Sequence, residues 1–241
     1  MRAVILAGGK GTRLLPYTTT IPKPLVPVGD MAIMEIVVHQ LSRCGFNHIT
    51  VAVNHQAQLI RAYFEDGKRW GITIDYSMED KPLGTMGPLR LIDDLPEHFL
   101  VMNGDVLTDI NYADFYQSHI DSGSIGTVAI YKRDVKIDFG VLGFGGEKNL
   151  ISEFVEKPVE HFCVSMGVYA FSREIMKYIP EAKPFGFDDL MLKLIAEKQD
   201  IRAHPFTGYW LDIGRPEDYD RANNEFEEII DRLLPPKPKS K

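Results

Sequence analysis

The sequence predicts an α/β fold with a Rossmann-like, mixed but mainly parallel sheet that is flanked by helices. The first observation is that short apolar runs, typical of buried strands, alternate with segments whose apolar residues have helical spacing. The expected strands are 3–6, 48–53, 72–76 and 98–102, and the expected helices between them are 32–44 and 58–64. Strands and helices that alternate at short intervals form βαβ units, whose strands lie parallel in one sheet.

The second observation is a change of pattern near residue 124. From there strand-like segments follow one another with glycine-containing turns, so we expect an antiparallel or mixed extension of the first sheet. The expected strands are 126–131, 140–144, 151–154, 164–171 and 201–204, and the expected helices are 173–178, 188–197 and 216–233. Because no linker or repeat separates two units, we expect one domain over 1–234, with halves at 1–123 and 124–234, and a disordered tail over 235–241.

Composition excludes several classes of partner. The 241 residues carry a net charge of −7, which argues against nucleic acid or an anionic membrane surface, because both attract basic proteins. Cys44 and Cys163 lack metal-binding spacing and indicate reduced thiols. The sequence has no signal-peptide apolar segment, no run of about 20 apolar residues and no hexapeptide repeat. We therefore expect a cytoplasmic protein without a membrane span and without a trimeric β-helix.

The clearest functional motif is a glycine-rich loop directly after the first expected strand. Glycines let backbone N–H groups approach phosphate oxygens closely, and nearby cations stabilise the phosphate charge. Lys10, Arg13 and Lys23 supply three cations, of which Arg13 can hold a pyrophosphate by two parallel hydrogen bonds. The spacing fits neither the dinucleotide fingerprint nor the Walker loop, so we predict a triphosphate site of another kind. Its nucleotide-binding residues are Leu6, Ala7, Gly8, Gly9, Lys10, Gly11, Thr12, Arg13 and Lys23.

The segments LAGGKGTRLLP at 6–16 and IPKPLVPVG at 21–29 resemble the signature of the sugar-1-phosphate nucleotidyltransferases. The resemblance extends up to the final helix and implies the fold of the nucleotide-diphospho-sugar transferases, which is similar to the GT-A type. It implies that the substrates are a nucleoside triphosphate and a sugar 1-phosphate, with Mg²⁺ as the cofactor. The sugar phosphate attacks the α-phosphorus in line and pyrophosphate leaves. The catalytic residues that the resemblance implies are Arg13, Lys23, Asp105 and Lys157.

The same resemblance implies further contacts to the nucleotide and the metal. The segment PLGTMGP at 82–88 is similar to a family segment in which Gly84 and Thr85 approach the base and ribose. NGD at 103–105 resembles the family's metal motif at the end of a central strand, which makes Asp105 a Mg²⁺ ligand. YWLDIG at 209–214 resembles the motif that carries the second metal carboxylate, Asp212. Two carboxylates are enough, because Mg²⁺ completes its coordination with waters and phosphates.

Three segments resemble the sugar-binding part of the family: DFGV at 138–141, EFVEKP at 153–158 and SMGVY at 165–169. The family has asparagine where this chain has serine at 165, and the shorter serine side chain leaves the identity of the sugar open. In this reading a lysine holds the sugar phosphate and a glutamate accepts hydrogen bonds from sugar hydroxyls. The sugar-phosphate-binding residues that the resemblance implies are Asn103, Gly140, Glu156, Lys157, Ser165 and Gly167.

Alternatives remain open from the sequence. The segments PLGTMGPL and PKPLVPVG are closer to guanylyltransferases, which favours GTP with mannose or heptose 1-phosphate over dTTP or UTP with glucose 1-phosphate. A non-catalytic subunit that binds nucleotide sugars would be expected to lose the metal carboxylates or Arg13, all of which this chain keeps. A dehydrogenase would need the dinucleotide spacing and an acidic residue about 20 positions on. A homodimer is left open.

Overall fold

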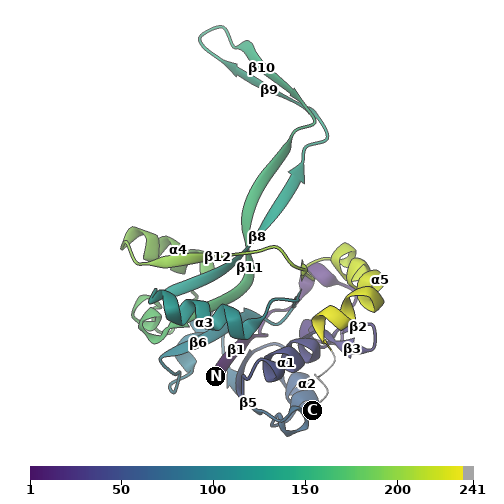
Figure 1. Ribbon diagram of the computed structural model, residues 1–241, viewed down its shortest axis with the longest axis vertical. Coiled ribbons are helices and arrows are strands. Elements are labelled where there is room, and N and C mark those ends of the chain that lie inside the picture. Colours follow the sequence, from purple (N-terminus) through teal and green to yellow (C-terminus); the bar gives the residue numbers. More distant parts are fainter. Residues whose placement is uncertain (236–241) are drawn as a thin grey trace.

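A seven-stranded sheet forms the centre of the molecule (Figure 1). The computed structural model describes residues 1–235; residues 236–241, which hold most of the expected disordered tail, lie outside the described residues. Only β11 runs antiparallel to its neighbours, which confirms the mixed, mainly parallel sheet that the sequence predicts. The strands, in spatial order, are β12 (Ile201–Phe206), β8 (Gly126–Lys136), β11 (Val159–Ser172), β6 (His98–Asn103), β1 (Arg2–Leu6), β4 (His48–Val53) and β5 (Thr73–Met78).

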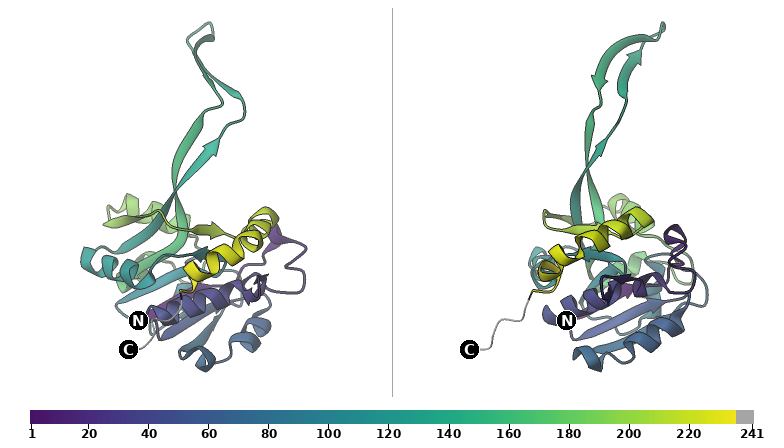
Figure 2. Two further views of the ribbon diagram at one scale, coloured as in Figure 1. Left: turned by 45° about the vertical axis from the view of Figure 1, so that its right-hand side comes forward. Right: turned by 90° about the vertical axis from the view of Figure 1, so that its right-hand side faces the viewer.

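Helices cover both faces of this sheet (Figure 2). The α-helices are α1 (Ile33–Arg43), α2 (Ala57–Phe64), α3 (Tyr112–Ser122), α4 (Phe187–Ala196) and α5 (Pro216–Leu233). Short 3-10 helices are η1 (Thr12–Leu14), η2 (Lys23–Leu25), η3 (Lys68–Trp70), η4 (Gly87–Leu91) and η5 (Arg173–Tyr178). The sequence predicts α1, α2, α4 and α5, but it leaves α3 out and gives η5 as an ordinary helix. Among the described residues, no helix is long and apolar enough to cross a membrane.

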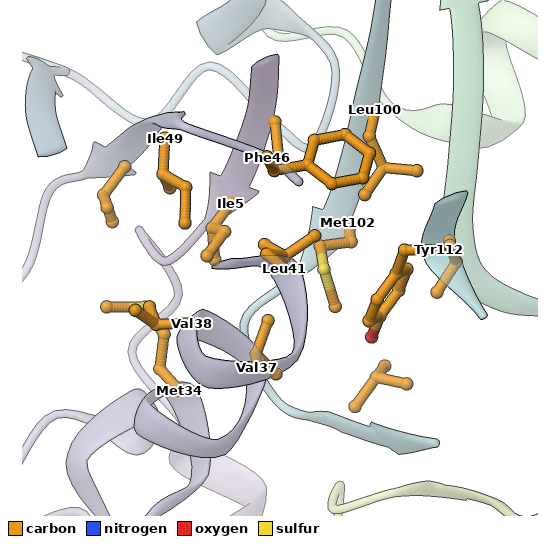
Figure 3. Close-up of a cluster of buried hydrophobic side chains, with 14 of the residues drawn as sticks. Ile5, Met34, Val37, Val38, Leu41, Phe46, Ile49, Leu100, Met102 and Tyr112 are labelled. Carbon is orange, nitrogen blue, oxygen red and sulfur yellow. The ribbon is translucent and has the colours of Figure 1, made fainter. Parts of the chain in front are cut away.

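Alternation along the central strands explains why both faces are covered. Successive side chains of a strand point to opposite faces, so an all-apolar strand must be buried on both. In β1, Ile5 belongs to one fully buried cluster, where it meets Val37 and Leu41 of α1 (Figure 3). Its neighbour Val4 belongs to a second buried cluster on the opposite face, which includes Leu190 of α4.

Two small strand pairs complete the part of the fold that positions the site. β2 (Pro27–Val28) pairs with β3 (Met31–Ala32), and β7 (Val106–Thr108) pairs antiparallel with β13 (Trp210–Asp212). The second pair joins the segment after β6 to the segment before α5. It therefore brings together two parts of the chain that are about a hundred residues apart in sequence.

A long arm projects from the body of the molecule (Figures 1 and 2). The outer halves of β8 and β11 pair with each other beyond the sheet, and they lead to β9 (Gly140–Gly145) and β10 (Leu150–Glu156). β9 and β10 form a separate two-stranded sheet, so the expectation that these segments extend the central sheet is wrong. The reason is that β8 and β11 extend beyond the ends of the neighbouring strands, so β9 and β10 at their far end pair with each other. We call residues 132–163 the arm.

Candidate active site

The glycine-rich loop follows β1 and ends at η1. Gly11 has a φ of +63°, a conformation that glycine adopts without strain, and a Cβ there would lie 2.9 Å from Thr18 Cγ2. A Cβ at Gly8 would lie 2.7 Å from Glu79 Oε1, closer than such atoms approach. A Cβ at Gly9 would have no atom within 4 Å, so this part of the loop faces open space. Two of the glycines therefore fix the loop's shape, and the third leaves its backbone open to a ligand.

Lys23 lies at the centre of the site. It begins η2 between Pro22 and Pro24, is only 9% exposed, and donates from Nζ to Oδ2 of Asp105. Asp105 follows β6, and its other oxygen, Oδ1, is buried without a hydrogen-bond partner. A buried carboxylate oxygen without a partner is unfavourable. The donor set therefore fits a cation, which would supply the missing partner.

The pairing of β7 with β13 places a second carboxylate beside the first. Asp212 ends β13, and the next N–H, that of Ile213, donates to the Asp105 carbonyl oxygen over 3.1 Å. Burial and the Asp105 carboxylate raise the pKa of Asp212, while Lys23 and Arg13 oppose the rise. Two like charges in a partly buried site repel each other. A divalent cation between Asp105 and Asp212 would relieve that repulsion.

Asp105 and Asp212 are the pair of carboxylates that the fold brings together beside Lys23. Among residues 1–235, no group of three or more His, Cys, Asp or Glu side chains is arranged to hold a metal ion. A pair suits Mg²⁺, which often takes one or two protein carboxylates and fills its remaining positions with waters and phosphate oxygens. The arrangement therefore matches an ion that is shared with a phosphorylated ligand.

Arg13 stands on the rim between two adjoining hollows, one on the side of the glycine loop and one on the side of Asp212. Its side chain is exposed, and Nη1 would be 3.8 Å from a Cβ at Gly214. No carboxylate in the described part of the chain forms an ion pair with Arg13. Its guanidinium can therefore bind an anion that enters either hollow.

The segment 82–88 forms the far wall of the site. Gly84 has a φ of +78°, and a Cβ there would lie 2.7 Å from the Phe185 carbonyl oxygen. Thr85 Oγ1 accepts a hydrogen bond from the Phe187 N–H over 2.7 Å. The chain before α4 thus holds this segment in place, and glycine is required where the two backbones meet.

Glu79 is a site residue that the sequence analysis missed. It follows β5 and is 8% exposed, and its Oε2 accepts a hydrogen bond from the Leu83 N–H over 2.8 Å. Burial raises the pKa of Glu79, and the hydrogen bond from Leu83 counteracts part of the rise. Its second oxygen points toward the loop at Gly8. The sequence around it, MEDKP, carries no motif, and only the fold shows that this one acid is buried against the loop.

These residues enclose a cleft of about 400 Å³, an ordinary size for a small-molecule site. The cleft lies at the carboxyl ends of β1, β4 and β6, where open α/β sheets bind their ligands. Lys10, Gly11 and Thr12 belong to the loop but do not line the cleft. The lining residues are Leu6, Ala7, Gly8, Gly9, Arg13, Lys23, Pro24, Ala52, Glu79, Pro82, Gly84, Thr85, Pro88, Asn103, Gly104 and Asp105.

Three of the expected sugar-phosphate residues meet at the edge of the cleft. Asn103 lines the cleft, and a Cβ at Gly167 would lie 2.7 Å from Asn103 Nδ2. Gly167 has a φ of +75°, and its N–H donates to Ser165 Oγ over 3.3 Å. Ser165 Oγ in turn donates to the hydroxyl of Tyr169 over 3.2 Å.

The structure does not bring the other three expected sugar-phosphate residues to the cleft. Gly140, Glu156 and Lys157 lie on the arm, are exposed, and line neither of the two hollows beside Arg13. Lys157 has a φ of +46°, so the chain bends where β10 meets β11. Their roles in binding a sugar phosphate stay predictions.

The chain resembles proteins of one enzyme family over most of its length. The family model described as "Nucleotidyl transferase" matches residues 2–229. The mannose-1-phosphate guanylyltransferase catalytic subunit beta of Dictyostelium discoideum is 36% identical over 225 residues, which cover 91% of this chain and 62% of the relative. The protein of the same name from Danio rerio is 35% identical over 226 residues, with the same coverage. This chain thus spans about 62% of the length of these curated relatives.

Solved structures agree with the sequence relatives. The crystal structure of HddC from Yersinia pseudotuberculosis has a TM-score of 0.72 and 27% identity, and the match covers 93% of this chain and 99% of that one. The same protein complexed with GMP-PN has a TM-score of 0.69, with the same identity and coverage. The fold, the site at the strand ends and the match over residues 2–229 lead to one conclusion. This chain belongs to the nucleotidyl transferase family.

Proposed function

We propose that this chain transfers a guanylyl group from GTP to mannose 1-phosphate or a heptose 1-phosphate, and releases pyrophosphate. The observation that carries the proposal is the meeting of Asp105, Asp212, Lys23 and Arg13 beside a glycine loop that is open to a ligand. This set of charges suits a triphosphate and a divalent cation. The names of the curated relatives support mannose 1-phosphate, and the complex of HddC with GMP-PN supports a guanine nucleotide.

Asp105 and Asp212 would hold Mg²⁺. The buried, unpartnered Oδ1 of Asp105 and the raised pKa of Asp212 support this assignment. When bound, the ion neutralises the charge of the phosphates and of the leaving pyrophosphate.

The protein's own groups orient the two substrates. A sugar-phosphate oxygen attacks the α-phosphorus of GTP, a new P–O bond forms, and the bond to the β-phosphate oxygen breaks. The attacking phosphate is already an anion at neutral pH, because its second pKa is about 6, so no general base is required. Arg13 binds the departing pyrophosphate, and Lys23 stabilises the α-phosphate. Lys157 binds the incoming phosphate. Catalysis consists of positioning and charge stabilisation.

Glu79 gives a physical reason why the site would prefer guanine as the nucleobase. Guanine presents two adjacent donors, N1–H and the exocyclic amino group, whereas uracil and thymine present a single ring N–H. The free Oε1 of Glu79 lies at the wall of the cleft and can accept such donors. A buried acceptor that the ligand leaves unpaired is unfavourable, so this carboxylate discriminates in favour of guanine.

Replacing Glu79 by Gln should reduce the preference for GTP. Gln keeps the oxygen that Leu83 needs but turns the other position into a donor, which opposes the donors of guanine. We expect kcat/KM for GTP to fall about 10- to 100-fold, while that for UTP changes little. Steady-state pyrophosphate release with both nucleotides measures the ratio. Asp80→Asn, at the exposed neighbouring position, is the control. An unchanged GTP-to-UTP ratio in Glu79→Gln would contradict the role of Glu79.

Residues 1–234 act as one catalytic domain in this proposal, because strands from both halves of the chain form the same central sheet. We place the protein in the cytoplasm, where nucleoside triphosphates are made and where Cys44 and Cys163 stay as thiols.

The net charge of −7 is compatible with small phosphorylated substrates. Such substrates do not require the basic surface that nucleic acid needs.

The decisive test of the activity is a pyrophosphate-release screen. GTP, UTP, dTTP, CTP and ATP are each offered with mannose, heptose and glucose 1-phosphates, with Mg²⁺ and with EDTA. We expect the highest kcat/KM for GTP with mannose or heptose 1-phosphate, and loss of turnover in EDTA. Preference for dTTP or UTP with glucose 1-phosphate would replace the substrate assignment. Absence of turnover with every pair would refute the proposed function.

A further inference from the structure

In the described part of the chain, the outer hairpin of the arm, β9 and β10, is exposed along its length. Every residue of β10 is exposed, and so is almost every residue of β9. The exposed apolar side chains of the arm are large: Phe144 is 69% exposed, Phe154 61% and Phe162 51%. A lone two-stranded hairpin is marginally stable in water, and large apolar side chains gathered on one exposed element are typical of a contact surface. The arm therefore requires a partner surface.

The base of the arm, where the β8–β11 register shifts between Ser165 and Tyr169, is anchored in the body. Met166 and Val168, where β11 enters the body, are buried, and the Met166 carbonyl oxygen accepts a hydrogen bond from Trp210 Nε1 over 3.0 Å. Beyond that point an unbroken ladder runs from the Ser165–Ile130 pair outward. To swing the arm back, the chain would have to break this ladder or expose the buried residues at its base.

The arm also carries groups that the proposed reaction needs. Lys157 lies two residues before the start of β11 at Val159, and the strand from Val159 to Ser165 spans about 20 Å at about 3.3 Å per residue. Glu156 lies beside Lys157. Bending the outer hairpin would not return Lys157 to its own cleft, because the lysine follows directly on the outer end of the β8–β11 ladder. The cleft of one chain thus has the nucleotide-binding groups but not Lys157, the lysine that the resemblance assigns to the sugar phosphate.

Three exposed apolar side chains that an arm could cover lie in the segment beside the cleft. Leu15, Tyr17 and Ile21 are 52%, 40% and 39% exposed, and they belong to the segment that connects Arg13 to Lys23. An arm that packs here would bring its polar groups next to the two cations that bind the triphosphate. One chain therefore presents exposed apolar side chains both on the arm and beside the cleft.

We propose that two copies of this chain exchange arms, so that the arm of each copy lies across the cleft of the other and supplies Glu156 and Lys157 to it. Each active site is then built from two chains. The exchange is reciprocal, which closes the assembly as a symmetric dimer. The proposal rests on the proposed function for the role of these two residues, and on the exposed arm for the dimer itself.

The mass of the protein in solution tests the dimer without reference to activity. Light scattering after size exclusion should give twice the 27.3 kDa of the chain. The double variant Phe144→Asp, Phe154→Asp should be monomeric, because charges cannot be buried in the arm contact. The matched control is Leu192→Asp, Ile195→Asp on α4, whose side chains are 69% and 67% exposed, and it should stay dimeric. A monomeric wild type, or an arm variant that remains a dimer, would overturn the exchange.

Complementation tests whether the arm acts on the other copy. Lys157→Ala disables an arm and Arg13→Ala disables a cleft, and the two chains are co-expressed with different affinity tags and purified through both. Each parent should be nearly inactive. The mixed dimer holds one complete site and one doubly defective site, so it should recover about half of the wild-type turnover.

If the mixed dimer is as inactive as its parents while the wild type is active, the arm serves its own chain and the proposal fails. If the wild type itself turns over no nucleotide and sugar pair, the proposed function fails instead, and the mass of the arm variants still decides the exchange.

Discussion

Replacing Asp212 by Asn is expected to lower kcat at least about 100-fold, the scale of losing one electrostatic stabiliser of a transition state. The substitution removes one of the two carboxylates that face the proposed metal and leaves the shape of the site unchanged. Half-maximal activation should also shift to a higher Mg²⁺ concentration, because Asp105 alone would hold the ion. Initial rates of pyrophosphate release at several Mg²⁺ concentrations measure both effects.

The same variant should not lose stability when the metal is absent. The raised pKa of Asp212 means that the folded state binds its proton more tightly than the unfolded state does. The folded state therefore loses stability as pH rises from about 3.8 through that raised pKa, and at neutral pH the charged group is unfavourable. Thermal unfolding in EDTA at neutral pH should give a Tm equal to or above that of the wild type. A clear fall in Tm, or near-normal turnover, would contradict the assignment.

Replacing Arg13 by Ala is expected to reduce kcat about 100- to 1,000-fold, because charge builds up on the departing pyrophosphate and Arg13 is the exposed cation placed to receive it. Its side chain makes no ion pair in the described part of the protein, so its removal should leave the Tm unchanged. Single-turnover measurements at saturating GTP separate the chemical step from binding.

Arg13→Lys is the informative companion variant. Lysine keeps the charge but loses the planar fork that binds two phosphate oxygens, so its kcat should lie between those of the wild type and Arg13→Ala. Arg202→Ala, which removes an exposed arginine of β12 that pairs with Asp200, is the control for loss of charge. If both variants at position 13 turn over at the wild-type rate, Arg13 has no part in the reaction.

Most helices and strands of the body can be predicted from local sequence patterns. β4 has the predicted bounds, 48–53, and so does α5, 216–233, because apolar spacing and turn residues agree there. The missed helix α3 is rich in tyrosine and polar residues, and its core contacts through Tyr112 and His119 do not look apolar in sequence. Its signals were present: Asn111 accepts hydrogen bonds from two N–H groups of the first turn, and Gly123 ends the helix with a left-handed conformation.

The arm could not be predicted in the same way. Its strands have ordinary β-forming residues, and nothing in the order of the sequence shows that β9 and β10 leave the central sheet. That outcome depends on the length of the β8–β11 ladder, which is a property of the folded chain. The sequence therefore predicts residues such as Lys157 for the site but cannot tell to which copy's cleft they belong.

Some residues of the site could likewise be predicted from the sequence, and others depend on the folded chain. The loop from Leu6 to Arg13 and the segment that ends at Asp105 could be predicted, because each is contiguous and follows a strand. Resemblance was needed to connect Asp212 with Asp105, and the pairing of β7 with β13 now gives the physical reason. Glu79 could not be predicted as a site residue, because its role comes from burial against the loop and not from its neighbours in sequence.

The central claim is that Asp105 and Asp212 share one divalent ion beside the nucleotide. Anomalous diffraction from crystals grown with Mn²⁺ and a non-hydrolysable GTP analogue measures this directly, since manganese replaces magnesium and can be located by its own scattering. We expect one manganese peak at about 2 Å from an oxygen of each carboxylate, with phosphate oxygens completing the coordination. Manganese bound only to the phosphates, out of reach of either aspartate, would contradict it.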